Sequence, residues 1–210
     1  MIDKTVRNLK TNPNDIIYTP KPVSLLMIKL CKIKSGSKVL DPSKGGGVFY
    51  DNLPSNCIKD YCEITENKDF FDYNDNVDLI IGNPPYSLWD KWLDHTMKIT
   101  NKFCYIFGFL NFTDARVRKI LNNGFGITKI HLLKIDWWFS HSYIVIFEKG
   151  KKSIITVEPK RILCDICDGR CLRGRNGNNA NTCTNIKNNL LMTFKLYKLW
   201  KLIIILLLNK

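Results

Sequence analysis

The chain has 210 residues, of which 45% are hydrophobic and 11% aromatic, and it carries a formal net charge of +13. This length allows one domain of ordinary size with a small appendage, and the apolar content excludes a wholly disordered chain. The charge is uneven, because residues 151–210 contain 12 Lys and Arg against 3 Asp and Glu, whereas residues 1–150 contain 20 against 16. Such a basic segment favours a polyanionic partner such as nucleic acid, although a lysine-rich solvated surface would have the same composition.

The amino-terminal residues contain no apolar stretch of the kind found in secretion signals, so we expect a chain that stays in the reducing cytoplasm. A polar lead-in over residues 1–17 is followed by a turn containing Thr19 and Pro20, and a helix is predicted over residues 23–31. Scattered cysteines suit buried thiols in such a compartment. They are Cys31, Cys57, Cys62 and Cys104.

A short strand predicted over residues 38–41 ends at an aspartate and runs into the glycine-rich turn 42–47 (PSKGGG). Glycines let the backbone approach a ligand closely, and the N–H groups of the helix predicted to begin within residues 48–53 favour a carboxylate or another anion. No Lys-Ser or Lys-Thr pair follows the last glycine, so this turn is not a phosphate-binding P-loop.

A second strand is predicted over residues 58–64, with Glu63 near its end. A carboxylate at a strand end roughly 20 residues after a glycine-rich turn is the arrangement that holds ribose hydroxyls, although it could also be an ordinary edge carboxylate. Asp69 and Phe70 follow after only five residues, too few for a crossover helix. Asp69 could accept a hydrogen bond from an adenine amino group and Phe70 could stack on its ring, or both could be turn and core residues.

The stretch 78–86 (DLIIGNPPY) has the pattern of a buried parallel strand that breaks at two prolines. Because neither a ladder nor a helix can continue through them, the backbone forms a stiff turn at the sheet edge where open α/β sheets bind ligands. The Asn83 side-chain oxygen and the Pro84 carbonyl can accept both hydrogens of a ring-conjugated amino group, and Tyr86 can stack on the ring. The alternatives are an ordinary Pro-Pro loop with a surface tyrosine, and a site for the amide of a glutamine side chain.

The remaining elements complete a doubly wound, mostly parallel α/β sheet with an antiparallel closing strand, in a domain predicted over residues 1–150. They are a helix over residues 89–100, a strand over 103–110, a helix over 113–122 capped by Thr113, and two closing strands over 127–135 and 142–148. The loop between the closing strands contains Trp137, Trp138 and Phe139. This cluster could be a hydrophobic plug or a surface on which splayed bases stack.

Together these motifs, over about residues 18–148, resemble the N6-adenine DNA methyltransferases that use S-adenosylmethionine, and most of all the compact phage and giant-virus enzymes of this kind. The resemblance implies a Rossmann-like class I methyltransferase fold and direct methyl transfer to the N6 of a flipped adenine in DNA, in a virus-encoded protein. It implies that the target base is held by Asn83, Pro84, Pro85 and Tyr86. It assigns the cofactor to Thr19, Pro20, Asp41, Pro42, Gly45, Gly47, Glu63, Asp69 and Phe70.

Two features depart from that family. The helix expected between Glu63 and Asp69 is missing, and no room remains for a large target-recognition domain, because the core closes near residue 150. Specificity would then come from loops, from the basic tail or from a separate specificity subunit, or it would be low. An RNA adenine or protein-glutamine methyltransferase with the same turn stays open, as does a catalytically idle nucleic-acid-binding module.

The basic tail, predicted over residues 151–210, contains a cluster of four cysteines, Cys164, Cys167, Cys171 and Cys183. Four thiolates this close together could form a tetrahedral structural zinc site, although only the first pair has the regular C-x₂-C spacing. Disulfides are the alternative and suit a reducing cell less well. The apolar end at residues 196–208 is interrupted by lysines and is shorter than the ~20 residues that a membrane span needs, so we expect no transmembrane anchor.

Overall fold

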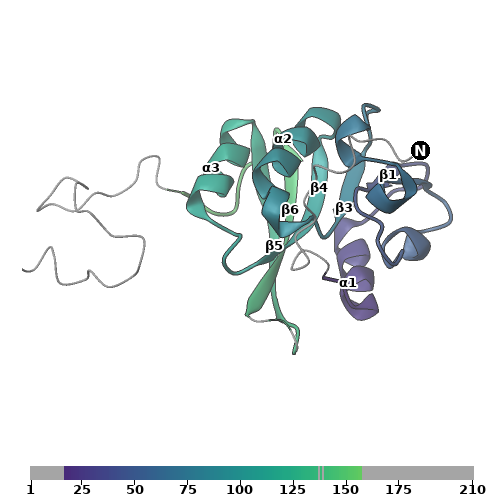
Figure 1. Cartoon of the computed structure of the whole chain (residues 1–210). Coiled ribbons are helices and arrows are strands. Elements are labelled where there is room, and N and C mark those ends of the chain that lie inside the picture. Colours follow the sequence, from purple (N-terminus) through teal and green to yellow (C-terminus); the bar gives the residue numbers. More distant parts are fainter. Residues whose placement is uncertain (1–16, 137, 139, 158–210) are drawn as a thin grey trace, which may run out of the picture. The chain divides into compact units, whose positions relative to one another are not determined.

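The computed structural model of the chain describes residues 17–136, 138 and 140–157 (Figure 1). They belong to the first of two units into which the chain divides, residues 1–157 and residues 158–210. Residues 151–157 pack on the body of the first unit: the Ile154 N–H donates to the Ile127 carbonyl at 2.9 Å, and Ile155 contacts the core.

A six-stranded sheet forms the centre of this unit, in the order β2-β1-β3-β4-β6-β5. The strands are β1 (Lys38–Asp41), β2 (Ile58–Tyr61), β3 (Leu79–Gly82), β4 (Lys102–Gly108), β5 (Phe125–Lys134) and β6 (His141–Lys149). The first four strands run parallel, and β6 is antiparallel to both of its neighbours. The chain steps outward from β1 to β2 and then returns to β3, so the strand order reverses between β1 and β3, where open α/β sheets bind ligands. The predicted doubly wound, mostly parallel sheet with an antiparallel closing strand is confirmed.

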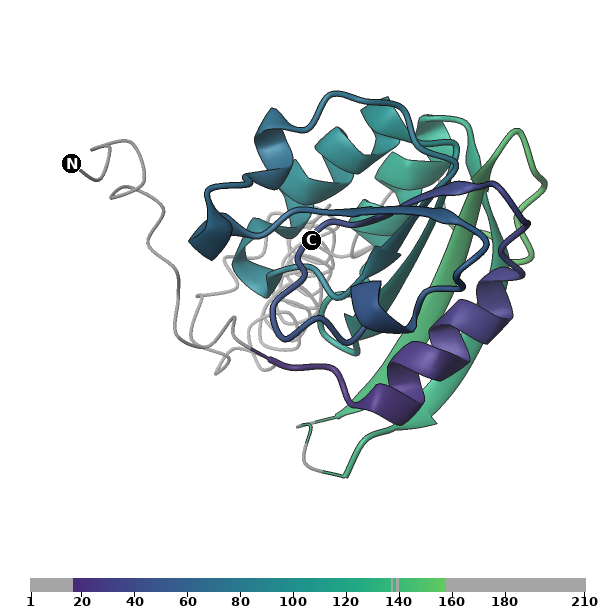
Figure 2. The ribbon, with the colours of Figure 1, turned by 90° about the vertical axis from the view of Figure 1, so that its right-hand side faces the viewer.

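Helices cover both faces of the sheet, with α1 (Lys21–Cys31) on one face and both α2 (Trp89–Ile99) and α3 (Asp114–Asn122) on the other (Figures 1 and 2). The predicted cap of α3 is present, because Thr113 Oγ1 accepts from the Arg116 N–H at 3.4 Å. Four short 3₁₀ turns complete the described part: η3 (Tyr50–Asn52), η4 (Ile64–Glu66), η5 (Phe70–Asp72) and η6 (Tyr86–Leu88).

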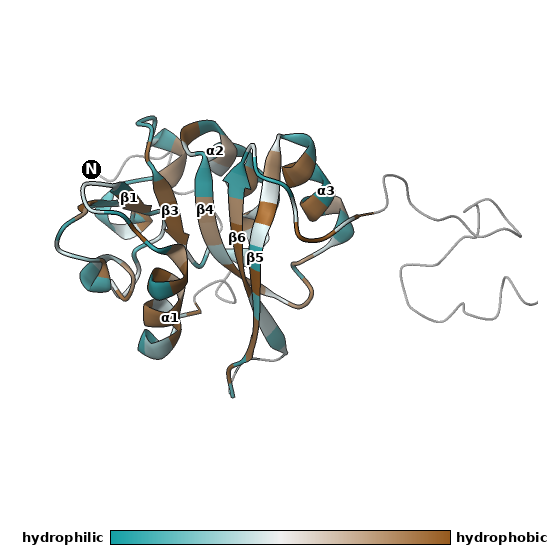
Figure 3. Cartoon of the chain, turned by 180° about the vertical axis from the view of Figure 1, so that it is seen from behind, coloured by the Kyte–Doolittle hydropathy of each residue, from teal (hydrophilic) through white to brown (hydrophobic). Residues whose placement is uncertain are grey.

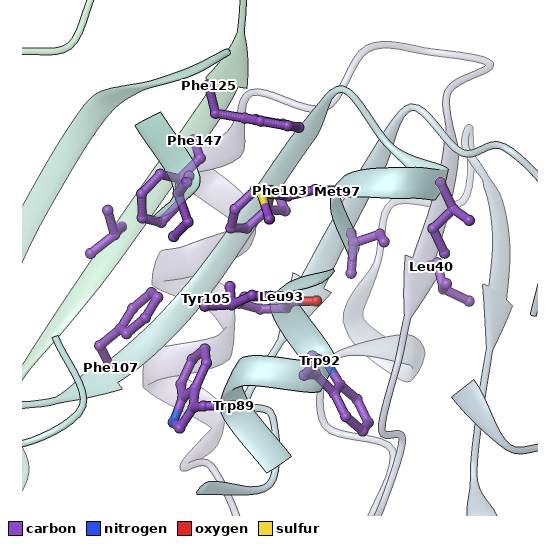
Figure 4. Packing of buried hydrophobic residues seen from close by; sticks show 14 of the residues in the cluster. Leu40, Trp89, Trp92, Leu93, Met97, Phe103, Tyr105, Phe107, Phe125 and Phe147 are labelled. Atoms are coloured by element: carbon purple, nitrogen blue, oxygen red, sulfur yellow. The ribbon is translucent and has the colours of Figure 1, made fainter. Parts of the chain in front are cut away.

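The core has two layers, because alternate residues of β3 and β4 point to opposite faces of the sheet. The layer under α2 and α3 is rich in aromatic side chains (Figure 4). In it Trp89 stacks on Phe107 at 4.3 Å between ring centroids, and Phe103 stacks on Phe147 at 4.6 Å. Truncating such a buried ring costs about 3–5 kcal/mol. The Trp89–Phe107 pair therefore holds the carboxyl end of β4 against α2.

Apolar residues follow the central strands, as the brown colour of β3 in Figure 3 shows. All four residues of β3 are buried, which fits the continuous apolar run that predicted a parallel strand covered on both faces. Among the helices of the described residues, none is long and apolar enough to cross a membrane.

Two local predictions differ from the structure. The helix expected to start within residues 48–53 is only the 3₁₀ turn η3, since Pro54 stops it after a single turn. The second strand ends at Tyr61, two residues before Glu63, which forms an isolated bridge with Lys68 instead. As the spacing predicted, no α-helix lies between β2 and β3, where residues 62–78 are all described.

Gly126 tests whether residues 151–157 belong to the body. A Cβ added at this position would overlap the Lys151 carbonyl oxygen and lie 2.7 Å from the Lys151 carbonyl carbon. We expect Gly126→Ala to lower the unfolding free energy of the full chain by about 1–3 kcal/mol through overpacking, measured by chemical denaturation. In a chain that ends at residue 150 the same substitution should be nearly neutral; an equal cost in both chains would contradict the packing.

Candidate functional site

Two cavities lie at the carboxyl edge of the parallel strands, and the turn after β3 contributes to both. The glycine-turn cavity has a volume of about 590 Å³ and is lined by Asn83 and Pro85 among others. The aromatic cavity, of about 620 Å³, is lined by Tyr86 and by the loop that follows β4. Ile17 and Tyr18 line both cavities, so the two spaces adjoin at this segment.

A buried carboxylate shapes the glycine-rich turn. Asp41 is fully buried at the end of β1 and accepts hydrogen bonds from the Ser43 N–H at 3.3 Å and the Tyr50 N–H at 3.2 Å. Burial raises the pKa of Asp41 to about 7, although these two N–H groups act to lower it. Asp41 therefore links the residues before and after the glycines through two hydrogen bonds, and it does not line either cavity.

The residues predicted to bind a cofactor divide into two groups. Those that line the glycine-turn cavity are Thr19, Pro42, Gly45, Glu63, Asp69 and Phe70. Those that line neither cavity are Pro20, Asp41 and Gly47. Pro20 caps α1, and its carbonyl accepts from the Val23 N–H at 2.9 Å. Gly47 has a φ of +80°, which favours glycine, and its N–H closes the turn onto the Lys44 carbonyl at 2.8 Å.

Glu63 joins two loops of the glycine-turn cavity. Its Oε2 accepts from the Gly45 N–H at 2.7 Å, and its Oε1 accepts from the Thr65 N–H at 3.1 Å and the Thr65 hydroxyl at 2.8 Å. Burial acts to raise the pKa of Glu63, but the hydrogen bonds from Thr65 and Gly45 outweigh it, so the pKa lies below its usual value. The carboxylate is thus ionised at neutral pH and can accept from a ligand as well.

Asp69 and Phe70 form a wall of the same cavity and are also structural. Asp69 Oδ1 caps η5 by accepting from the Phe71 N–H at 2.9 Å. Phe70 is 2% exposed and stacks on Trp92 of α2, with 4.4 Å between the ring centroids and 29° between the planes. The turn and core roles are therefore present, and both residues also line the cavity, whereas their contact with an adenine ring stays a prediction.

Asn83 presents an oxygen that lacks a hydrogen-bond donor. Its Nδ2 donates to the Ile17 carbonyl at 3.1 Å, and its backbone carbonyl accepts from Ser43 Oγ at 3.3 Å. Its Oδ1 is buried and has no hydrogen-bond partner in the described part of the chain. Such buried acceptors are rare, and this one is free to accept a hydrogen bond from a ligand.

The other residues of the turn lie differently. Pro84 is buried and lines neither cavity, whereas Pro85 lines the glycine-turn cavity. Tyr86 starts η6 and its ring lies nearly parallel to that of Trp89, at 6.3 Å between centroids and 18° between planes. The four residues predicted to hold a target base are thus brought together, but only Tyr86 lines the aromatic cavity.

The loop after β4 supplies site residues that the sequence interpretation missed. The predicted strand over residues 103–110 ends at Gly108, so Phe109 and Leu110 are 56% and 69% exposed at the aromatic cavity instead of continuing the strand. Because both side chains are apolar, the sequence pattern did not indicate that the strand ends before them. Gly108 before them and Asn111 after them are the signals that could have indicated it.

The opposite wall of the aromatic cavity comes from the start of β6 and the loop before it. Trp138 is 9% exposed, packs in the core layer next to α1 and also lines the cavity. The core packing agrees with the predicted hydrophobic plug, and the stacking of splayed bases stays a prediction. Trp137 and Phe139 lie outside the described residues.

Metal binding was predicted only for the tail. Cys164, Cys167, Cys171 and Cys183 lie outside the described residues, so the zinc site stays a prediction. Within the residues that the structure describes, no group of three or more His, Cys, Asp or Glu side chains could hold a metal ion.

Comparison with known proteins concerns the fold. No protein family model and no curated protein matches this sequence. Among solved structures, Trm5b from Pyrococcus abyssi has a TM-score of 0.51 at 12% identity, over 64% of this chain and 50% of that chain. TrmN from Thermus thermophilus has a TM-score of 0.47 at 13% identity, over 61% of this chain and 48% of that chain. Precorrin-6y C5,15-methyltransferase from Geobacter metallireducens has a TM-score of 0.49 at 13% identity, over 64% and 90%.

The chain therefore spans about half the length of the first two of these proteins. The sheet order and the likeness to Trm5b agree on the class of fold, which is a Rossmann-like, doubly wound α/β fold.

The buried Asp41 carboxyl makes stability depend on pH. Its pKa is raised in the folded state, so between the unfolded value of 3.8 and about 7 the folded chain binds the additional proton. The contribution of Asp41 to the unfolding free energy should then fall as pH rises from 4 to 7, by on the order of 4 kcal/mol at most. Asp41→Asn should remove this dependence, measured by denaturation across that range. A difference between the two proteins that stays flat from pH 4 to pH 8 would contradict the buried-carboxyl account.

Proposed function

We propose that this chain is a methyltransferase that transfers a methyl group from S-adenosylmethionine to the N6 amino group of adenine in DNA. The observation that carries the proposal is the position of the turn after β3. It contributes Asn83 to one cavity and Tyr86 to the other, and it holds the unpartnered Asn83 oxygen. A methyl donor bound in one cavity and a methyl acceptor bound in the adjoining cavity would meet at this turn.

The glycine-turn cavity fits S-adenosylmethionine. Its volume of about 590 Å³ is in the usual range of about 300–1,000 Å³ for small-molecule sites. Glu63 is an ionised acceptor for ribose hydroxyls, Asp69 an acceptor for the adenine amino group, and Phe70 a flat apolar wall. When bound, S-adenosylmethionine would supply a methyl group whose carbon–sulfur bond breaks as the bond to nitrogen forms, leaving S-adenosylhomocysteine and one released proton.

The amino acceptor would lie beside Asn83 and Tyr86. The lone pair of a ring-conjugated amino group is delocalised, so acceptors that bind its hydrogens favour a more nucleophilic nitrogen. Asn83 Oδ1 is one such acceptor, and the Pro84 carbonyl is the proposed second one. The Tyr86 ring would orient the base by stacking. No covalent enzyme intermediate is needed, and neither cavity is lined by a cysteine in the described residues.

A flipped base fits the rim of the aromatic cavity. The exposed side chains at this rim are Tyr18, Phe109 and Leu110, at 66%, 56% and 69% exposure. Apolar side chains of this kind can contact the bases that flank an extruded nucleotide. The choice of DNA over RNA or a protein glutamine rests on the sequence resemblance and on the basic composition of residues 151–210. We further propose that this tail or a separate specificity subunit adds DNA contacts in a cytoplasmic setting.

Asn83→Ala tests the proposed chemistry. We expect it to lower methyl transfer by about 100-fold or more, because a hydrogen bond to the reacting group is lost. S-adenosylmethionine affinity by calorimetry should stay within a few-fold, since the proposed cofactor contacts lie elsewhere in the cavity. The assay uses labelled S-adenosylmethionine with DNA, RNA and protein acceptors in parallel. Near-wild-type transfer by the variant would contradict the role of Asn83. If only RNA or only protein were labelled, that acceptor and not DNA would be the substrate.

Glu63→Ala tests the cofactor site, with Glu66→Ala as its matched control. Glu66 belongs to the same loop and binds Lys44 at 3.0 Å and the Tyr61 hydroxyl at 2.7 Å, but it lines neither cavity. We expect Glu63→Ala to weaken S-adenosylmethionine binding by about tenfold or more, through loss of hydrogen bonds to a charged acceptor. Glu66→Ala should leave the affinity nearly unchanged. If calorimetry showed that both substitutions weaken S-adenosylmethionine binding equally, disruption of the loop would explain the lower affinity instead.

A further inference from the structure

The aromatic cavity contains polar side chains that the proposed reaction does not use. One of them is Asn111, which an arginine holds in a defined orientation. Arg116 Nη1 donates to Asn111 Oδ1 at 3.2 Å and to the Asn111 carbonyl at 3.1 Å. Arg116 is itself anchored by Asp90, whose Oδ1 accepts from Nε at 3.1 Å. A guanidinium group only donates hydrogen bonds, so the Asn111 Oδ1 must face Arg116. The NH₂ group of Asn111 therefore points away from Arg116.

The second polar side chain is Ser142, near the start of β6. It is 1% exposed and lines the aromatic cavity, and its Oγ has no hydrogen-bond partner in the part of the chain that the structure describes. A buried hydroxyl without a partner costs free energy in folding and points to a ligand.

These two side chains both lie beside Gly108, the last residue of β4. Ser142 is directly opposite Gly108 in the antiparallel pair of β6 and β4, and such partners project to the same face with Cβ atoms about 4.5–5.5 Å apart. A Cβ placed on Gly108 would lie 3.7 Å from Asn111 Nδ2 and 3.9 Å from the Tyr86 hydroxyl. The Asn111 donor, the Ser142 hydroxyl and the Tyr86 ring are therefore gathered around the glycine.

We propose that Asn111 Nδ2 and Ser142 Oγ recognise unprotonated ring nitrogens of the target base. This inference rests on the function proposed above and narrows its substrate class to a heterocyclic amine. The pyrimidine ring of adenine offers two acceptors, N1 and N3, whereas guanine carries a hydrogen at N1 and a glutamine carboxamide has no ring nitrogen at all. The pair thus selects adenine over a protein amide even though both carry an NH₂ group that Asn83 can bind.

A purely structural role predicts different behaviour. If Ser142 served only the fold, Ser142→Ala would remove an unpaired buried hydroxyl and leave stability unchanged or slightly improved, with no effect on ligands. Recognition predicts unchanged or improved stability together with weaker substrate binding. For Asn111 the informative change is Asn111→Asp, which keeps the shape and the acceptor for Arg116 but removes the donor.

The experiment measures binding of adenosine, 1-deazaadenosine and 3-deazaadenosine by calorimetry to the full chain, with S-adenosylhomocysteine saturating the other cavity. We expect at least one deaza analogue to bind wild-type protein about 10- to 100-fold more weakly than adenosine, the effect of one unmet hydrogen bond. This contrast should disappear in Asn111→Asp or in Ser142→Ala. The matched control is Asn123→Asp, because Asn123 is exposed at the end of α3, donates to the Lys119 carbonyl at 2.8 Å and lines neither cavity.

The outcomes separate this inference from the proposed reaction. Equal affinity for the three nucleosides, no binding of adenosine, or a contrast that survives in both variants would overturn the recognition. Transfer of methyl groups to DNA adenine without any deaza contrast would overturn the recognition and leave the reaction in place. A contrast that the variants remove, in a protein that methylates no adenine, would overturn the reaction and leave the recognition in place.

Discussion

Two consecutive prolines after β3 prevent the strand from continuing, and the turn they impose is the element on which both cavities depend. The strand before them is buried on both faces, and the Trp89 side chain after them is fully buried in the aromatic core layer. Neither end of the turn can therefore shift without opening the core. Because of this constraint, the short turn at the carboxyl edge of the sheet holds Asn83 and Tyr86 in fixed positions, as a preorganised site requires.

Local signals predicted most of the fold, because they depend on neighbours in sequence. Residues 38–41 form the predicted strand with the predicted bounds, and Thr113 caps α3 as its side chain suggested. The loop at Phe109 and Leu110 was missed, because its apolar residues continue the pattern of β4. Where that strand ends depends on its pairing with β6, and pairing between distant strands is not encoded in local periodicity.

The candidate site shows a similar division. Spacing identified the segments at the cavity, such as Glu63 and Asp69, but it did not separate the residues that line it from those that support it. Asp41 and Gly47 stand next to cavity residues in sequence, yet one ties the turn from beneath and the other closes it. The distinction depends on the path of the backbone through the turn, and a residue with a positive φ changes that path within one position.

The two cavities are also joined mechanically through α2. Trp89 and Trp92 are three residues apart and so lie on neighbouring positions of one helix surface. Trp89 stacks beside Tyr86 of the aromatic cavity, whereas Trp92 stacks on Phe70 of the glycine-turn cavity. Because no α-helix between β2 and β3 holds the loop of Phe70, α2 takes over that support. One helix thus sets the position of a wall in each cavity, which fixes the distance between these two walls.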